Sequence, residues 1–465
     1  MRNLQDRTLD RMVNYAASIE YDDLPSEVVH QVKKLIIDSF GCGIRAYNSV
    51  PVKAARELAS TYLCSKTATL LGTEIQSTPD LAAFVNGIMV RYLDFNDNYA
   101  GKSNAHPSDN IAPMIAVAEA TGATGKDLIT GIVLAYEIQS AWADTFRLKD
   151  GGPWDQAVYP TISTPLGAGK ILGLNKKKLA EALRLSIVQG LPLLEARRGQ
   201  ISHWKACAVP NAGRNGIVSA FLAEKGLTGP PKIFEGEAGF FKAVANRCLH
   251  LEKLAMENGL NVPFRIMKSS IKRFPAGFFS QTAIEGALVT REILRISDTS
   301  DIKSVNIGTF DHGFSVMGRD LSRWRPTTRE TADHSLPYVV SCALKFGSVQ
   351  IGHFDSEVLV DKTLIELMDK TTVNIDPECQ SAWPDSTLNK VTVTMKDGRS
   401  HTEVISHYLG HFIHPMSDGE IKDKFCKLTH GLLLAEQQEG FFNIIEGLED
   451  LNDISEIFRN LLIQT

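Results

Sequence analysis

Apolar residues recur at helical spacing through most of the first 270 positions of the chain. Asp23 and Pro25 mark a helix start, and the pattern then runs from 29 to 40 until Gly41 and Gly43 loosen it. Further helical patterns cover 79–99, 125–136, 160–173, 177–190, 212–225 and 238–246. Such stripes are typical of core-forming faces, so this part is predicted to be a packed helical domain without strand–helix alternation.

The pattern changes after about residue 270. A strand-like run includes Ile302, Val305 and Ile307, and a second covers 391–395. The second run reaches an Asp-Gly pair at 397–398 and is followed by another β-rich run, which predicts a hairpin. Helical patterns at about 329–346 and 361–370 lie between these strands. We therefore expect an α+β module here.

Helical pattern returns near residue 410 and continues to the end of the chain. Ser417 and Glu420 have the spacing of a capping box at the start of a new helix. The predicted fold class is mainly α with an α+β lid, in which a large all-helical domain is built from both chain ends. The predicted divisions are 1–268 (helical domain), 269–408 (α+β lid domain) and 409–465 (C-terminal helices returning to the helical domain).

Composition narrows the classes of partner. The 465 residues are 43% hydrophobic and 22% charged, with a net charge of −5. This lacks the basic footprint of a nucleic-acid-binding protein, so an anionic substrate would be attracted by a local cluster of cations. No apolar run approaches the length of a membrane span, and the first seven residues lack the apolar core of a secretion signal. We expect neither nucleic acid nor membrane as a partner.

The seven cysteines are scattered, and no Cys-x-x-Cys pair occurs. Neither an iron–sulfur cluster nor a structural zinc site therefore has a sequence signature. The pattern favours reduced thiols in a cytosol-like compartment. Three histidines at 407, 411 and 414 do not have the spacing of a zinc-binding helix, and we interpret them as part of a loop.

The densest polar segment covers 94–99 and 106–110, between two apolar helices. A helix end followed by a new N-cap would account for Ser108 and Asp109, either of which could cap a helix that begins near Ile111. The residues that this interpretation leaves unexplained are Asp94, Asp97 and His106.

Two lysines stand in segments of low charge. Lys205 lies between Trp204 and Ala206, just before a predicted helix start, and Lys272 precedes Arg273 in another such segment. Most lysines are solvated surface residues. A lysine in apolar surroundings instead needs an anionic partner or has a shifted pKa, so it binds a carboxylate or acts as an acid or base.

Four motifs together give the chain a resemblance to the MmgE/PrpD family over essentially its whole length. They lie in the family's order, at 92–97 with 106–110, 204–206, 272–276 and 328–338. The segments 95–97, 274–276 with 281–283, and 329–335 look closest to the 2-methylcitrate dehydratase branch. The cis-aconitate decarboxylase branch would be expected to carry histidines near Trp154 and Gln281, and neither is present.

The resemblance implies a helical domain, a smaller α+β lid, a homodimer and a site between the domains. It also implies a small tricarboxylate substrate. The matching site positions are Asp94, Asn98, His106, Lys205 and Lys272. The family commonly has threonine at the position of Asn98. Iminodisuccinate epimerisation is a third activity within the family.

The resulting hypothesis is a carbon–oxygen lyase of class EC 4.2.1 that dehydrates 2-methylcitrate, or a citrate-like acid, to a cis-aconitate-type alkene. Lys205 and Lys272 would hold carboxylates, with Asn98 as a further binding residue, and Asp94 and His106 would form the acid–base pair. We expect no metal and no cofactor. The location expected is cytoplasmic, or mitochondrial in a eukaryote. The alternatives are a cis-aconitate decarboxylase-like enzyme and a catalytically silent dimeric scaffold.

Overall fold

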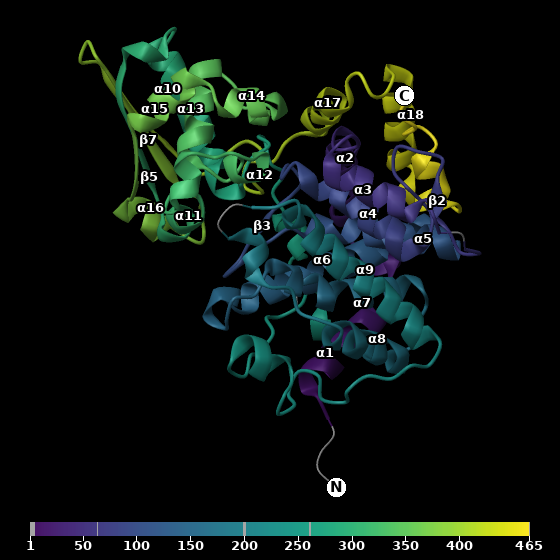
Figure 1. The fold of residues 1–465 in the computed structure, drawn as a ribbon. Coiled ribbons are helices and arrows are strands. Elements are labelled where there is room, and N and C mark those ends of the chain that lie inside the picture. Colours follow the sequence, from purple (N-terminus) through teal and green to yellow (C-terminus); the bar gives the residue numbers. More distant parts are fainter. Residues whose placement is uncertain (1–4, 63, 199–200, 260–261, 465) are drawn as a thin grey trace.

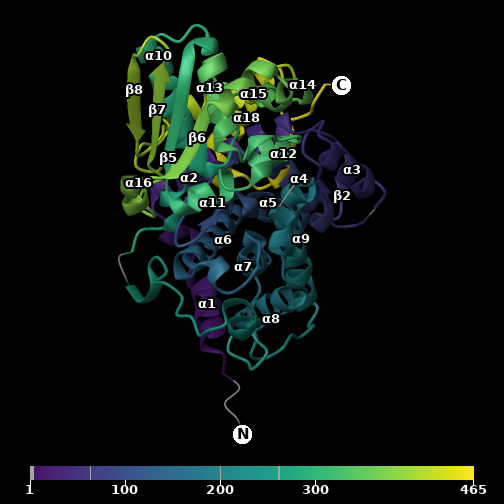
Figure 2. The same cartoon turned by 60° about the vertical axis from the view of Figure 1, so that its left-hand side comes forward.

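The structure is a computed structural model that describes residues 5–62, 64–198, 201–259 and 262–464. It has a large helical part and a smaller part built around a sheet (Figures 1 and 2). The mainly α fold class with an α+β portion is therefore confirmed. Residues 1–4, which belong to the segment used to judge the secretion signal, lie outside the described residues.

The large part begins with a succession of helices along the chain. They are α1 (Arg7–Ser18), α2 (Ser26–Arg45), α3 (Val50–Ala59), α4 (Pro79–Tyr92), α5 (Ile111–Thr121), α6 (Gly125–Thr145), α7 (Pro160–Ile171), α8 (Lys176–Val188) and α9 (Trp204–Glu224). α6 begins with a capping box in which Thr124 and Asp127 satisfy each other's backbone N–H groups. Two short hairpins join β1 (Ala68–Thr69) to β2 (Gln76–Ser77) and β3 (Tyr99–Ala100) to β4 (Asn104–Ala105).

Several predicted helix boundaries in this part were wrong. α2 continues through Gly41 and Gly43 to Arg45. Glycine at 43 allows close packing, because a Cβ there would lie 2.8 Å from Leu71. α4 ends at Tyr92 rather than near 99. α9 begins at Trp204 and includes Pro210, so Lys205 lies on its first turn rather than before it.

The smaller part contains a four-stranded sheet in the order β6-β5-β7-β8. β5 (Ile302–Thr309) pairs in parallel with β6 (Thr371–Ile375) and antiparallel to β7 (Asn389–Met395). The predicted hairpin is confirmed: β7 pairs with β8 (Ser400–Ile405), and Gly398 in the turn has a φ of 95°. The helices of this part are α10 (Gln281–Leu294), α11 (Asp311–Met317), α12 (Arg329–Ala332), α13 (Leu336–Phe346), α14 (Ser356–Leu359), α15 (Lys362–Asp369) and α16 (Pro377–Ala382).

The helix predicted over 329–346 is in fact broken. α12 ends at Ala332, and α13 begins after Ser335, whose hydroxyl accepts from the backbone N–H of Tyr338 as its N-cap. The break places Asp333 and His334 on a short connection between the two helices, and both belong to the candidate site described below.

The C-terminal helices α17 (Asp418–Thr429) and α18 (Ala435–Glu446) pack beside α2, as the yellow ribbons in Figure 1 show. The capping box of Ser417 and Glu420 is confirmed. Phe441 stacks on Phe40 of α2 with ring centroids 5.9 Å apart, so both chain ends contribute to one hydrophobic core. A second core lies within residues 274–408. We retain the divisions at 268/269 and 408/409 as a proposal.

The three histidines at 407, 411 and 414 lie between β8 and α17 in a turn, as the loop interpretation predicted. Among the described residues, no helix combines the length and the apolar character needed to cross a membrane.

Candidate functional site

The site is built around the loop that follows α4. Asp94 lies near the start of this loop. Its backbone is left-handed, with a φ of 50°, which a non-glycine residue rarely adopts. Only 2% of the residue is exposed, and its backbone N–H donates to Arg91 O at 3.1 Å. Strained backbone of this kind persists where the surrounding contacts fix it and is concentrated at functional sites.

Asp97 fixes the two ends of the loop to each other. Its carboxylate accepts from the hydroxyl of Ser108 at 2.6 Å, from the backbone N–H of Ser108 at 3.1 Å and from the hydroxyl of Tyr136 at 3.0 Å. Burial raises the pKa of Asp97 to about 6, although these hydrogen bonds oppose the shift. Asp97 therefore has a structural role that its residue type did not reveal.

The capping roles predicted for Ser108 and Asp109 were wrong. α5 follows a short 3₁₀ turn, and neither side chain caps it. Ser108 bonds to Asp97 instead, and the carboxylate of Asp109 lies 3.2 Å from Nε of Arg91. Burial raises the pKa of Asp109 to about 7 against the opposing charge of Arg91.

His106 lies at the N-terminal end of the same 3₁₀ turn and is 5% exposed. Its Nδ1 lies 2.6 Å from the backbone oxygen of Asp97. Because a carbonyl oxygen can only accept, Nδ1 carries the proton and Nε2 of the neutral ring keeps its lone pair. Burial holds the pKa of His106 well below its usual range, and the charge of Arg91 acts in the same direction. The ring therefore has the protonation state of a general base.

Lys272 lies beneath Asp94 and is wholly buried. Its ammonium donates to the carboxylate of Asp94 and, at 2.8 Å, to the backbone oxygen of the same residue. Burial lowers the pKa of Lys272, although Asp94 opposes the shift. Burial would raise the pKa of Asp94, but Lys272 and Lys205 hold it well below its usual range. Each group thus favours the charged form of the other.

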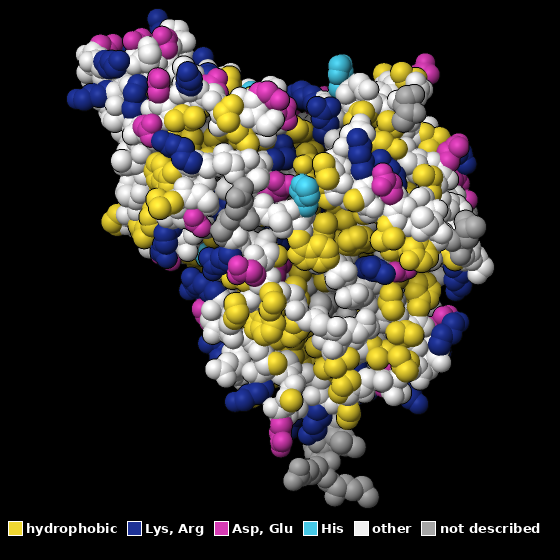
Figure 3. Space-filling view, in the orientation of Figure 1, with side chains coloured by type: hydrophobic (Ala, Val, Ile, Leu, Met, Phe, Trp, Pro, Cys, Tyr) yellow, Lys and Arg dark blue, Asp and Glu magenta, His cyan; other side chains and the backbone are white. Residues whose placement is uncertain are grey.

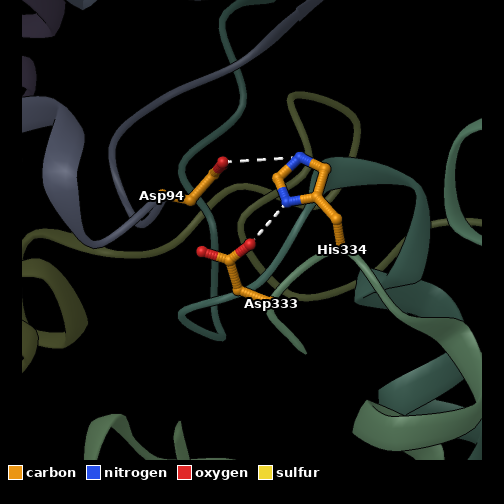
Figure 4. Close-up of side chains that lie close together, drawn as sticks. All are labelled: Asp94, Asp333 and His334. Carbon is orange, nitrogen blue, oxygen red and sulfur yellow. Dashed lines mark hydrogen bonds and ion pairs between the residues drawn. The ribbon is translucent and has the colours of Figure 1, made fainter. Parts of the chain in front are cut away.

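Lys205 connects this loop to the break between α12 and α13. Its ammonium lies 3.2 Å from Oδ2 of Asp94, 2.8 Å from Oδ1 of Asp333 and 3.1 Å from Nδ1 of His334. The ring of His334 in turn contacts both acids, with Nδ1 2.6 Å from Asp333 and Nε2 3.5 Å from Asp94 (Figure 4). Residues from three distant segments thus meet at one point.

Asp333 and His334 were missed as individual site residues. The motif at 328–338 contains both residues, so the sequence held a signal for them. Because one uninterrupted helix was predicted through this motif, nothing singled the two residues out. Together with Asp94 they are a group of three potential metal ligands within the described residues. The ammonium of Lys205 contacts all three, so the group already has a cation at its centre and does not fit a divalent ion.

A cavity of about 440 Å³ opens beside these residues. Asp94, His106, Lys205 and His334 line it. Neither Asn98 nor Lys272 is among the described residues of its wall. Asn98 is fully buried, its backbone pairs with Ser270, and its side-chain amide has no hydrogen-bond partner among the described residues.

The wall of this cavity is strongly cationic. Nine lysine and arginine residues face two aspartates, Asp94 and Asp320. The cations are Arg91, Lys102, Arg147, Lys149, Arg197, Arg198, Lys205, Arg319 and Arg323. Some of these cations pair with acids outside the wall, among them Arg91 with Asp109 and Arg197 with Asp155. In a chain with a net charge of −5, the wall is still a local concentration of positive charge, which attracts anions.

Two models of one protein family match most of this chain. The N-terminal domain of MmgE/PrpD matches residues 10–248, and the C-terminal domain matches 274–450. The chain belongs to the MmgE/PrpD family.

Relatives of two named activities are similar over most of their length. The human cis-aconitate decarboxylase is 26% identical over 93% of this chain and 90% of its own. The 2-methylcitrate dehydratase of Salmonella typhimurium is 27% identical over 87% of this chain and 86% of its own. The mitochondrial 2-methylcitrate dehydratase of Yarrowia lipolytica is 27% identical over 86% and 80%, respectively.

Proposed function

We propose that this chain is a hydro-lyase that dehydrates 2-methylcitrate, or a citrate-like tricarboxylate, to the corresponding alkene without a metal ion. The observation that carries the proposal is the cationic cavity in which a neutral His106 lies near the Asp94–Lys205 pair. A trianion suits this charge, and both a base and a cationic group reach the same space.

The protonation states support a division of roles. His106 takes the proton from the carbon next to a carboxylate through its free Nε2. Lys205 stabilises the negative charge that develops on that carboxylate, and its ammonium gives a proton to the departing hydroxyl, which leaves as water. Transfer of the proton from His106 back to Lys205 restores the enzyme. Asp94 stays ionised and holds both lysines, so Lys205 takes the place predicted from the sequence for Asp94 in the acid–base pair with His106.

Lys272 and Asn98 then act from behind the cavity wall. Lys272 fixes the orientation of Asp94 through two hydrogen bonds and maintains its charge. This differs from the direct carboxylate binding expected of Lys272 from the sequence. Asn98 lies in the same loop as Asp94 and would help to position Asp94 through that loop.

Decarboxylation of cis-aconitate is the second candidate, because one observation favours it. The cavity wall includes His312 of α11, which stacks on Trp383, and burial lowers its pKa to about 4. This supplies a neutral imidazole although none stands near Trp154 or Gln281 in the sequence. Gln281 itself is occupied, because its side-chain amide binds the backbone of Phe274.

A product-resolved assay with 2-methylcitrate, citrate and cis-aconitate separates these functions. Dehydration gives an alkene that absorbs near 240 nm, a rough working wavelength, whereas decarboxylation releases carbon dioxide. We expect alkene and water from 2-methylcitrate. Carbon dioxide release from cis-aconitate without dehydratase activity would establish the second candidate, and binding without turnover would establish a silent scaffold.

We further propose that the chain forms a homodimer. Hydrophobic side chains gather over the middle of the face shown in Figure 3. Independently of that view, Trp204 and Leu193 are large apolar residues that are 48% and 61% exposed in the single chain. Contiguous exposed apolar surface is typical of protein interfaces. A cytoplasmic or, in a eukaryote, mitochondrial location remains part of the same proposal.

A further inference from the structure

Arg323 lies in the cavity wall and is largely buried. The residue is 4% exposed, and its Nε and Nη1 make no hydrogen bond to any described residue. The carboxylates of Asp320 and Asp333 act on it only through space. A buried cation is costly unless an anion binds to it, so this side chain is suited to receive one.

The backbone around Arg323 is held firmly. The hydroxyl of Ser335 donates to the backbone oxygen of Arg323, and the same hydroxyl caps α13. The indole N–H of Trp324 donates to Gly318 O at 2.9 Å, and Asp320 caps the 3₁₀ turn by accepting from the backbone N–H of Ser322. The backbone that carries the Arg323 side chain is therefore held in place before any ligand arrives.

A second cation faces the same space from the other part of the protein. Arg198 follows the 3₁₀ turn Leu194–Arg197 in the helical part and lines the cavity. Burial lowers the pKa of Arg323, and the positive charge of Arg198 acts in the same direction. A carboxylate between the two guanidinium groups would offset both the burial of the Arg323 charge and its repulsion from Arg198.

We propose that Arg323 binds the carboxylate on the arm of the substrate that is remote from the carbons undergoing dehydration. The proposal rests on the proposed function for the identity of that substrate. The planar fork of a guanidinium matches a carboxylate in a bidentate arrangement. The residue thereby distinguishes a tricarboxylate from a dicarboxylate, while Lys205 and His106 act on the reacting carbons.

The test uses two ligands that cannot react. Tricarballylate has three carboxylates but neither a hydroxyl nor a double bond, and succinate lacks the third arm. Calorimetric titration of the full chain should show that Arg323→Met weakens tricarballylate binding roughly 10- to 100-fold, as expected for loss of a charged hydrogen-bonding group. Succinate binding should change less than about threefold, which is under 1 kcal/mol.

Arg325 provides a matched control. It follows the same turn, is exposed, pairs with Asp369 and is not part of the cavity wall. Arg325→Met should leave the affinity for both ligands unchanged. Arg323→Lys keeps the charge without the fork and should show an intermediate loss, which guards against a folding defect in Arg323→Met.

Each outcome decides the proposal. Unchanged tricarballylate affinity in Arg323→Met, equal losses for both ligands, or no binding of tricarballylate by the wild-type chain would overturn it. Turnover of 2-methylcitrate is measured separately. If binding depends on Arg323 but no turnover occurs, Arg323 is confirmed as a carboxylate-binding residue and the proposed function is rejected. If turnover occurs but binding does not depend on Arg323, the proposed function stands and the role of Arg323 is rejected.

Discussion

Lys272 donates from one ammonium group to both the side chain and the backbone carbonyl of Asp94, although 178 positions separate them in the chain. The pair connects the loop after α4 to the segment that enters the smaller part. Because both groups are buried, each depends on the other for its charge. In this position Asp94 also forms an ion pair with Lys205.

Removing one member of this pair should destabilise the fold. Lys272→Met leaves Asp94 with Lys205 alone, and we expect a loss of about 3–5 kcal/mol in the free energy of unfolding. The double variant Lys272→Met/Asp94→Asn should recover part of that loss, because no buried charge is then left uncompensated. Urea unfolding measures both. Lys268→Met changes an exposed lysine nearby and should have little effect; equal stability of all variants would disprove the coupling.

Substitution of the two cavity residues should remove turnover in protein that circular dichroism shows to be folded. Lys205→Ala also leaves Asp94 and Asp333 with one cation fewer, so this variant should be less stable than the wild type. His106→Gln loses the proposed base and Lys205→Ala loses the proposed acid, and each should lower kcat by roughly 10²–10⁴-fold. His30→Gln and Lys225→Ala are exposed controls away from the cavity. Near-normal rates in both His106→Gln and Lys205→Ala would show that the site is wrongly assigned.

The lowered pKa of His106 predicts a change of stability with pH. The unfolded chain binds a proton at this position below about pH 6.5, whereas the folded chain does not until a lower pH. His106 therefore contributes a loss of stability as the pH falls through 6.5, of about 1 kcal/mol at pH 5.5. The raised pKa values of Asp97 and Asp109 act in the opposite direction, so the effect of His106 is the difference between wild type and His106→Gln.

Unfolding of wild type and His106→Gln at pH 7.5 and 5.5 checks this prediction. The wild type should lose more stability than the variant over this interval. His430→Gln, at an exposed position, should resemble the wild type. Equal losses in wild type and His106→Gln would indicate that His106 is protonated normally in the folded chain.

Lys424 of α17 should support the site from a distance. Its ammonium donates to Asp38 at 2.6 Å and to the backbone oxygens of Phe95 and Lys272 at 2.9 and 2.8 Å. Lys424→Met leaves Asp38 buried without its cation, so we expect a loss of about 3–5 kcal/mol and a lower kcat. Lys427→Met on the same helix is exposed and serves as the control. Unchanged unfolding of Lys424→Met would contradict this role.

The sequence predicted features that depend on local patterns. Helical periodicity, the Asp-Gly hairpin and the capping box at Ser417 are set by residues close together in the chain, and the structure contains them. The boundaries that failed were determined by tertiary packing. Gly43 lies within α2 where Leu71 packs closely against it, and no local signal contains that contact.

The candidate site was predictable only as a set of residue types. The motifs indicated Asp94, His106, Lys205 and Lys272, but not that Lys272 lies behind the wall while Lys205 faces the cavity. That distinction depends on contacts between segments more than 100 positions apart. The role of Arg323 likewise required the three-dimensional arrangement, since an arginine in a short turn has no sequence signature.

The most direct test of the central claim is turnover of 2-methylcitrate in the presence of a chelator, with the products identified. We predict formation of the alkene and water at an undiminished rate with chelator, and its loss in both His106→Gln and Lys205→Ala. Carbon dioxide as the product, loss of activity on chelation, or the absence of any turnover would contradict the account.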